Sequence, residues 1–122
     1  MNTKRFLFAA TIFAIVALVL AACGGGGSAP EPLNITLHAL DIKFDVATIE
    51  AKVGQTVNVT YVNDGALDHT FIIEGLVTEQ KITAGQTITF AFTPTTAGTF
   101  QYYCNVPGHE EAGMVGTLTV NP

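Results

Sequence analysis

Three side chains that bind soft or borderline metals stand at intervals of five residues in the segment CNVPGHEEAGM. They are Cys104, His109 and Met114. Thiolate and thioether sulfur favour Cu(I), whereas imidazole accepts either oxidation state of copper. Pro107 restricts the backbone between the first two ligands and Gly108 can take conformations closed to other residues, so the loop can bring His109 back toward the sulfur. This segment therefore offers three metal ligands and lacks a fourth.

His69, in the stretch NDGALDHTFII, is the candidate for the fourth ligand. It follows a turn and stands at the head of an apolar strand expected at residues 71–73. The stretch TFQYYC alternates with period two, which places Tyr102 and Cys104 on one face of a strand and the thiol on the core side at its end. Two imidazoles, one thiolate and a weak axial thioether form the ligand set of mononuclear blue copper sites.

Period-two alternation recurs along the rest of the chain, while no stretch keeps helical spacing for long. Glycine, proline and asparagine punctuate the pattern at short intervals, so that seven or eight strands fit in about ninety residues. The pattern predicts an all-β fold, an antiparallel sandwich or small barrel with one core. The residues expected to face inward are Val57, Val59, Tyr61, Ile88, Phe90, Phe92, Leu118 and Val120.

The stretches YYCNVPGHEEAGMVGTLTV, NDGALDHTF and FTPTTAGTF together resemble the cupredoxin family, and the loop spacing is similar to that of the auracyanins. The resemblance implies a Greek-key β-sandwich over residues 33–122. It also implies one type 1 copper bound by His69, Cys104 and His109, with Met114 as a long axial ligand. The implied function is electron transfer, with membrane redox complexes or cytochromes as partners.

Residues around the implied ligands bear on the reduction potential. Plastocyanins and azurins commonly have an asparagine directly after the first histidine, where this chain has Thr70. Thr70 can supply a hydroxyl to the same region, and Asn63 and Pro107 are further candidates for supporting residues. Glu110 and Glu111 are expected either to be solvated or to help orient a partner. His38 is expected at an exposed strand position and not as a ligand.

The N-terminus is predicted to carry an export signal. Lys4 and Arg5 precede an apolar stretch over residues 6–22, and the sequence LAAC then resembles a bacterial lipobox. We expect a lipoprotein signal peptide at residues 1–22, a lipid on Cys23, and a Gly/Ser/Pro-rich tether at residues 23–32. The protein would then be extracytoplasmic and anchored to a bacterial membrane. An uncleaved membrane helix and simple secretion are the alternatives. Cys104 is the only cysteine besides Cys23.

Charge and composition narrow the classes of partner. Beyond residue 22 the chain has three lysines and ten acidic residues, a formal net charge of −7. Such a chain is a poor match for nucleic acid. A basic protein partner and a merely solvated acidic surface are both compatible with it. At 122 residues the chain is expected to form one domain and to be a monomer.

These residues bear on four possible functions. An electron carrier fits a four-ligand site without substrate machinery. A copper enzyme is disfavoured because the chain lacks the length and the additional histidines for further copper centres, and a binuclear oxidase-type centre needs a second nearby cysteine. A copper storage, sensing or delivery protein is the main alternative, and a metal-free adhesive sandwich is the last.

Overall fold

The computed structural model describes residues 27–122, which contain eight β-strands and no helix. The expected signal peptide at residues 1–22 and the expected lipid site at Cys23 lie outside the described residues. No helix within residues 27–122 has the length and apolar character needed to cross a membrane. The strands are β1 (Leu33–Ala39), β2 (Thr48–Lys52), β3 (Val57–Asn63), β4 (His69–Ile73), β5 (Val77–Ile82), β6 (Thr87–Phe92), β7 (Gly98–Tyr103) and β8 (Val115–Asn121).

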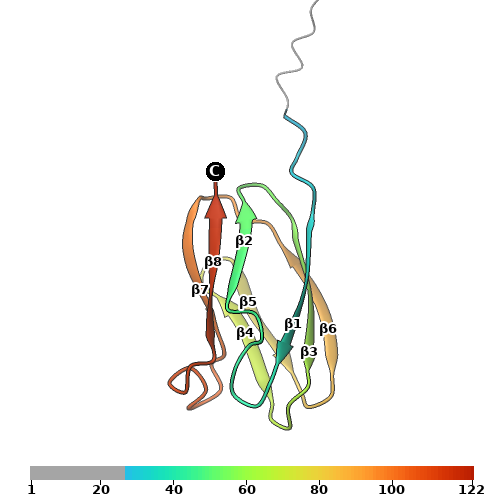
Figure 1. The fold of residues 1–122 in the computed structure, drawn as a ribbon, viewed down its shortest axis with the longest axis vertical. Coiled ribbons are helices and arrows are strands. Elements are labelled where there is room, and N and C mark those ends of the chain that lie inside the picture. The colour runs from blue at the N-terminus through green and yellow to red at the C-terminus, as the bar shows by residue number, and fades with distance from the viewer. Residues whose placement is uncertain (1–26) are drawn as a thin grey trace, which may run out of the picture.

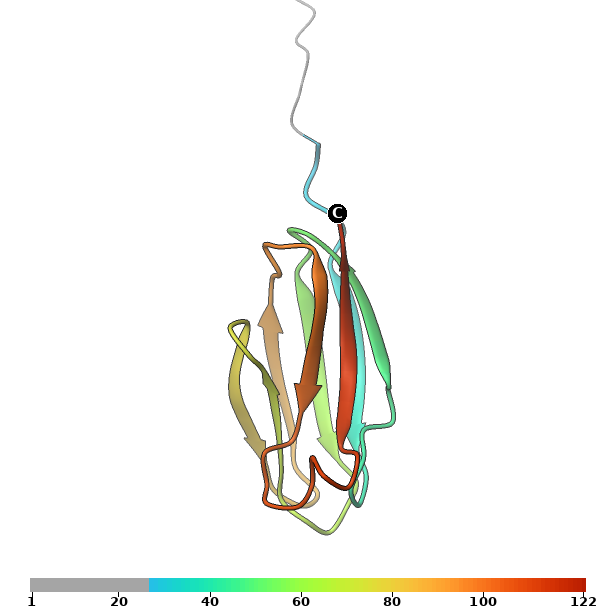
Figure 2. The same cartoon turned by 90° about the vertical axis from the view of Figure 1, so that its left-hand side faces the viewer.

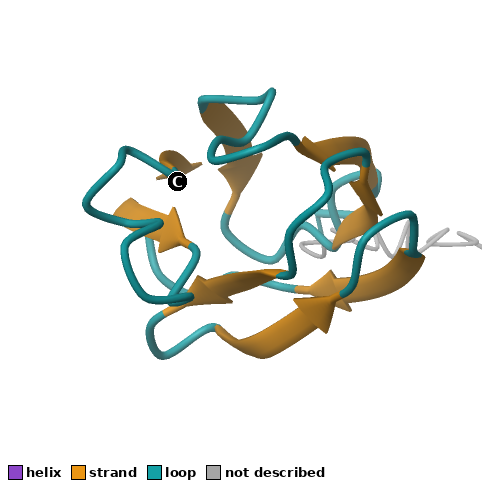
Figure 3. Ribbon diagram, turned by 90° about the horizontal axis from the view of Figure 1, so that it is seen from below, coloured by secondary structure: helices purple, strands orange, loops and turns teal. Residues whose placement is uncertain are grey.

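The strands form two sheets that face each other across one core (Figures 1 and 3). One sheet has the order β1-β3-β6 and the other has the order β2-β8-β7-β4-β5. The predicted all-β sandwich of seven or eight strands is therefore confirmed. The burial along β3 shows why the sequence pattern predicts this sandwich: every second side chain of that strand is buried.

The sheets are mixed, whereas the sequence pattern predicts antiparallel strands throughout. Four strand pairs are antiparallel, but β1 pairs with β3 in parallel and β2 pairs with β8 in parallel. The chain passes from β1 to β2 in the opposite sheet and then returns to β3, so β1 and β3 run in the same direction. Alternation of side chains reports which face is buried and carries no information on the direction of the neighbouring strand.

The core is built from the inward-facing residues that the alternation predicts. The predicted residues of β3 and β8 are buried, whereas in β6 only Phe92 is buried and Ile88 and Phe90 are partly covered. Four aromatic rings with centroids 5.3 to 6.3 Å apart join the two sheets. These rings belong to Phe44, Tyr61, Phe71 and Tyr102.

The two ends of the sandwich differ in what they hold. At one end the described chain enters at residues 27–32 and the C-terminus lies close by (Figures 1 and 2). The loops of residues 40–47, 64–68 and 104–114 lie at the other end, which we call the ligand pole (Figure 1). Residues 27–32 belong to the expected tether and form no regular structure, but the Glu31 carbonyl accepts a hydrogen bond from Gln55 Nε2 at 2.8 Å.

Candidate metal centre

Cys104 follows the last residue of β7 and is fully buried at the ligand pole. Tyr102, two residues earlier, points to the same side and is also fully buried, as the period-two pattern predicts. The Cys104 N–H donates to the Met114 carbonyl at 3.2 Å, which closes the loop between β7 and β8. The thiol therefore sits at the base of a closed loop.

The loop between Cys104 and Met114 consists of consecutive turns. The His109 N–H donates to the Val106 carbonyl and the Met114 N–H donates to the His109 carbonyl, each at 2.9 Å. Gly108 has a φ of 84°, in the left-handed region that favours glycine, so the chain can reverse directly before His109. His109 is 7% exposed and Met114 is fully buried, so both side chains turn inward.

His69 enters the centre from β4, whose first residue it is. The turn before it is held by Asn63, whose side-chain amide donates to the Leu67 carbonyl at 2.7 Å and accepts from the Gly65 N–H at 2.9 Å. Asn63 is 1% exposed, so these bonds are shielded from water. The position of His69 at the head of an apolar strand is as the sequence predicts, and its side chain is fully buried.

Ligand atoms of His69, Cys104 and His109 lie within 4.8 Å of one another. The two Nδ1 atoms of the histidines are 3.2 Å apart, and Cys104 Sγ lies 3.5 Å from His109 Nδ1. Nitrogen and sulfur ligands at about 2.0–2.1 and 2.3 Å from one ion at a tetrahedral angle would be separated by about 3.4 Å for N to N and 3.6 Å for N to S. The observed separations fit three ligands of a single metal ion.

The chemistry of the three donors narrows the choice of metal. Two imidazoles and one thiolate with a thioether nearby are typical of copper that changes between Cu(II) and Cu(I). Met114 joins the group through its backbone, which is hydrogen-bonded to both Cys104 and His109, while its side chain lies in the core. The structure thus brings the ligand atoms of three predicted residues together and places Met114 at the end of the loop that holds two of them.

The protonation of His69 suits a metal ligand. Burial lowers its pKa, and the neighbouring His109 lowers it further, while the Leu40 carbonyl, Asp41 and Asp68 act in the opposite direction. The neutral ring favoured in this way can offer the lone pair of Nδ1 to a metal ion and keep its hydrogen on Nε2. Nε2 is buried and makes no hydrogen bond of good geometry within residues 27–122, so the Leu40 carbonyl acts on the ring only weakly.

Thr70 supplies the hydroxyl expected from it. Its N–H lies 3.4 Å and its hydroxyl oxygen 3.6 Å from Cys104 Sγ. Asn105, which the sequence analysis did not single out, donates its N–H to that hydroxyl at 2.9 Å. The sequence signal for this role of Asn105 is its position directly after Cys104. Asn63 supports the turn before His69 and makes no hydrogen bond to a ligand atom within residues 27–122, and Pro107 is exposed.

His38 lies apart from the three converging ligands. It is a half-buried residue of β1 whose Nδ1 lies 2.5 Å from Asp64 Oδ2, and its N–H donates to Asp45 Oδ1 at 2.7 Å. These contacts tie the end of β1 to the loops beside it. His38 therefore has a structural role at the rim of the ligand pole, close to the exposed position predicted for it.

Comparisons with known sequences agree with this geometry. A family model described as a cupredoxin-like domain matches residues 10–120. Auracyanin-A of Chloroflexus aurantiacus is 29% identical over 161 aligned positions, which cover 98% of each chain. The copper-resistant cuproprotein CopI of Rubrivivax gelatinosus is 29% identical over 99 positions, 65% of this chain and 60% of that protein.

Solved structures share the fold. The dithionite-reduced auracyanin of Roseiflexus castenholzii superposes with a TM-score of 0.67 at 21% identity, over 76% of this chain and 100% of that one. A copper nitrite reductase of Nitrosomonas europaea gives the same TM-score at 22% identity, but only 42% of its chain is covered. The family match and the converging two-histidine, one-cysteine group with Met114 beside it indicate one type 1 copper, and the chain belongs to the cupredoxin family.

Proposed function

We propose that this protein is a one-electron carrier whose single copper is held by His69, Cys104, His109 and Met114. The proposal depends on one observation: the ligand atoms of His69, Cys104 and His109 converge in a buried site. Met114 belongs to the same loop as Cys104 and His109. Bound copper would supply the Cu(II)/Cu(I) couple. The protein supplies a packed set of ligands that rearranges little between the two states.

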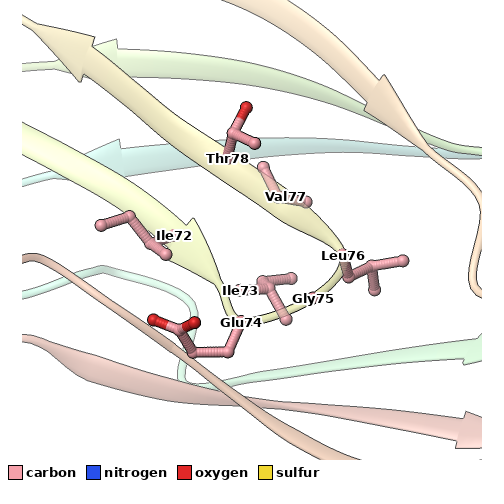
Figure 4. A pocket seen from close by; sticks show the side chains of 7 residues that line it. All are labelled: Ile72, Ile73, Glu74, Gly75, Leu76, Val77 and Thr78. Atoms are coloured by element: carbon pink, nitrogen blue, oxygen red, sulfur yellow. The ribbon is translucent and has the colours of Figure 1, made fainter.

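Burial of the ligands favours electron transfer over chemistry on a substrate. None of the four is more than 7% exposed, so a substrate has no direct approach to them. A hollow of about 350 Å³ lies elsewhere, around the turn between β4 and β5, and is lined by consecutive residues 72–78 of that hairpin (Figure 4). It contains no ligand residue, and its only acidic side chain is Glu74.

Electrons would enter and leave at the ligand pole. His109 has the largest exposed fraction of the four ligands, 7%, and is the ligand nearest to solvent. The two large apolar side chains that are exposed within residues 27–122 are Ile42 and Leu67, and both lie in loops of this pole. Exposed apolar side chains at the same pole as the ligands suit transient contact with a redox partner. Membrane redox complexes or cytochromes are the partners proposed.

The arrangement of the ends suits a protein tethered by its N-terminus. Residues 27–32 enter at the end of the sandwich opposite the ligand pole (Figures 1 and 2). A lipid on Cys23 at an extracytoplasmic membrane surface would therefore leave the ligand pole facing away from the attachment point. The anchor, the compartment and the monomeric state are parts of this proposal.

Copper reconstitution tests the proposed function. Cu(II) added to the metal-free protein should give an intense visible thiolate-to-copper band and a narrow copper hyperfine splitting, and Cys104→Ser should abolish both. Stopped-flow mixing with a reduced cytochrome should then show fast one-electron transfer. A pale product, or a blue protein that exchanges electrons only very slowly, would contradict the carrier function.

A copper storage or delivery function is the second candidate, because the relative from Rubrivivax gelatinosus is named a copper-resistant cuproprotein. Storage or delivery requires copper to be exchanged readily. The buried ligands favour retention instead. Incubating the loaded protein with a modest chelator separates the two: a carrier should keep its copper for hours, and a delivery protein should lose it quickly.

A further inference from the structure

A series of polar contacts connects the buried Cys104 sulfur with a carboxylate on the surface. The Thr70 hydroxyl oxygen lies 3.6 Å from Cys104 Sγ and 2.8 Å from Asn105 Oδ1. Asn105 Nδ2 in turn donates to Glu79 Oε2 at 2.8 Å. Glu79 is an exposed residue of β5, the outer strand of the five-stranded sheet. The series thus begins at the metal centre and ends at the sheet edge.

The donors and acceptors in this series fix its direction. A carboxylate only accepts hydrogen bonds, so the Asn105 side-chain amide must turn its nitrogen toward Glu79. Its oxygen, Oδ1, then faces Thr70. The Asn105 N–H already donates to the Thr70 hydroxyl oxygen at 2.9 Å, so the hydroxyl has one hydrogen to give. Oδ1 at 2.8 Å is the better acceptor than Sγ at 3.6 Å. Of the two Thr70 donors, only the N–H then remains directed at the sulfur, at 3.4 Å.

Turning the Asn105 amide by half a turn would reverse this pattern. Nδ2 would then donate to the Thr70 hydroxyl oxygen, and the hydroxyl hydrogen would have only Cys104 Sγ as an acceptor. Thr70 is 3% exposed, so water does not replace the missing partner. The sulfur would receive two hydrogen bonds from Thr70 instead of one.

We infer that Glu79 is a positioning residue for the metal centre: through Asn105 it turns the Thr70 hydroxyl away from Cys104 and limits the hydrogen bonds that the sulfur receives. The effect on potential rests on the proposed function. Reduction adds negative charge to the centre, and a donor directed at the sulfur stabilises that charge. Glu79 therefore holds the reduction potential below the value that the turned amide would give.

The variant Glu79→Lys tests the inference because an ammonium group only donates and so requires Oδ1 of Asn105. The positive charge of the lysine also raises the reduction potential directly. This direct effect is screened at about 1 M salt, where the Debye length is about 3 Å. Thr70→Val removes the hydroxyl and keeps the shape. Glu50→Lys, on β2, is the matched change of charge at another exposed strand position.

Redox titration of the copper-loaded variants is the first measurement. At high salt we expect Glu79→Lys to raise the reduction potential when Thr70 is present. Glu79→Lys in the Thr70→Val background should leave the potential unchanged, and so should Glu50→Lys. An increase that is equal in both backgrounds and disappears at high salt would be a simple charge effect and would overturn the inference.

NMR on the metal-free protein is the second measurement and does not depend on copper. In Glu79→Lys, the Asn105 side-chain NH₂ protons should show nuclear Overhauser contacts to the Thr70 methyl group that are absent in the unsubstituted protein. Unchanged contacts would overturn the inference. Failure of the blue copper spectrum would count against the proposed function alone, since the amide orientation is tested separately.

Discussion

The body of the sandwich and its ligand pole bury different kinds of side chain. The body is filled by aliphatic residues and four clustered aromatic rings. The buried polar residues within residues 27–122 are instead found at or beside the ligand pole, and they are Asn63, His69, Thr70 and His109. Apolar burial is strong but non-directional, whereas hydrogen bonds fix the positions of individual atoms. Stability therefore comes mainly from the body, and the position of the ligands comes from the pole.

This difference implies that the two regions fail in different ways when altered. A change in the body should lower the free energy of unfolding while the folded molecules keep their copper site. A change at the pole should alter the site in molecules that are still folded, because a misplaced donor affects the ligands directly. Substitutions in each region can separate these outcomes.

Gly116→Ala should have the largest effect and should act on the body. Gly116 on β8 lies opposite Tyr102 on β7, and a Cβ atom there would lie 2.0 Å from the tyrosine ring. Overpacking of this kind costs about 1–3 kcal/mol, and we expect the upper end because the ring is fully buried. Urea unfolding should show the loss, with Thr117→Ala as a neighbouring control.

The copper spectrum of Gly116→Ala tests whether the body also positions the ligands. The fraction of Gly116→Ala that folds should bind copper with an unchanged charge-transfer band, since Gly116 touches no ligand atom. A loss of stability below about 1 kcal/mol would show that the Tyr102 ring moves aside, and a changed spectrum would show that the body also positions the ligands.

Asn63→Ala should have the next largest effect and should act on the pole. It removes the two hydrogen bonds of the turn before His69 and leaves the Gly65 N–H and the Leu67 carbonyl without that partner. We expect a loss of about 2 kcal/mol, at about 1 kcal/mol for each bond, together with a shifted charge-transfer band. Asn63→Asp keeps an acceptor for the Gly65 N–H but turns a carboxylate oxygen toward the Leu67 carbonyl in a site that is 1% exposed, so it should lose at least as much as Asn63→Ala. An unchanged band would contradict the role of this turn in placing His69.

Much of this arrangement could be predicted from the sequence because its signals are local. The period-two pattern places Cys104 and Tyr102 on the core side, and the equal spacing in one loop identifies three of the four ligands. The direction of β1 and β2 relative to their neighbours could not be predicted, because pairing depends on contacts between segments far apart in the chain.

Phe44 and Glu79 show why other features escaped prediction. Phe44 lies in the loop between β1 and β2, where no alternation marks it, yet it is buried among the aromatic rings. Glu79 contacts Asn105 across 26 positions of sequence, and nothing local distinguishes it from a solvated strand residue. Both depend on how the sheets pack.

The pH dependence of stability should separate the two regions in the metal-free protein. Burial raises the pKa of Tyr102 in the body to about 12, with Asp45 adding to the shift. The native state thus keeps a proton that the unfolded state loses above about pH 10, so stability falls between about pH 10 and 12. Chemical unfolding across this range should show the decline, and Tyr102→Phe should weaken it.

The acid side should report on the pole. The pKa of His69 is lowered by burial and by His109, so below about pH 6.5 the unfolded state binds a proton that the native state does not. Stability should therefore fall as the pH drops below about 6.5, by at most about 1.4 kcal/mol per pH unit for one proton. His69→Asn should reduce this slope. An identical acid slope in that variant would assign the decline to other groups.

Asp64→Ala should have the smallest effect, although Asp64 follows Asn63 directly in the sequence. Its carboxylate contacts His38 at the rim of the pole, where the two side chains are 49% and 36% exposed. An exposed pair of this kind contributes less than about 1 kcal/mol. Urea unfolding should show a small loss, and the copper spectrum should not change. A loss as large as that of Asn63→Ala would mean that the rim, and not only the buried turn, determines where His69 lies.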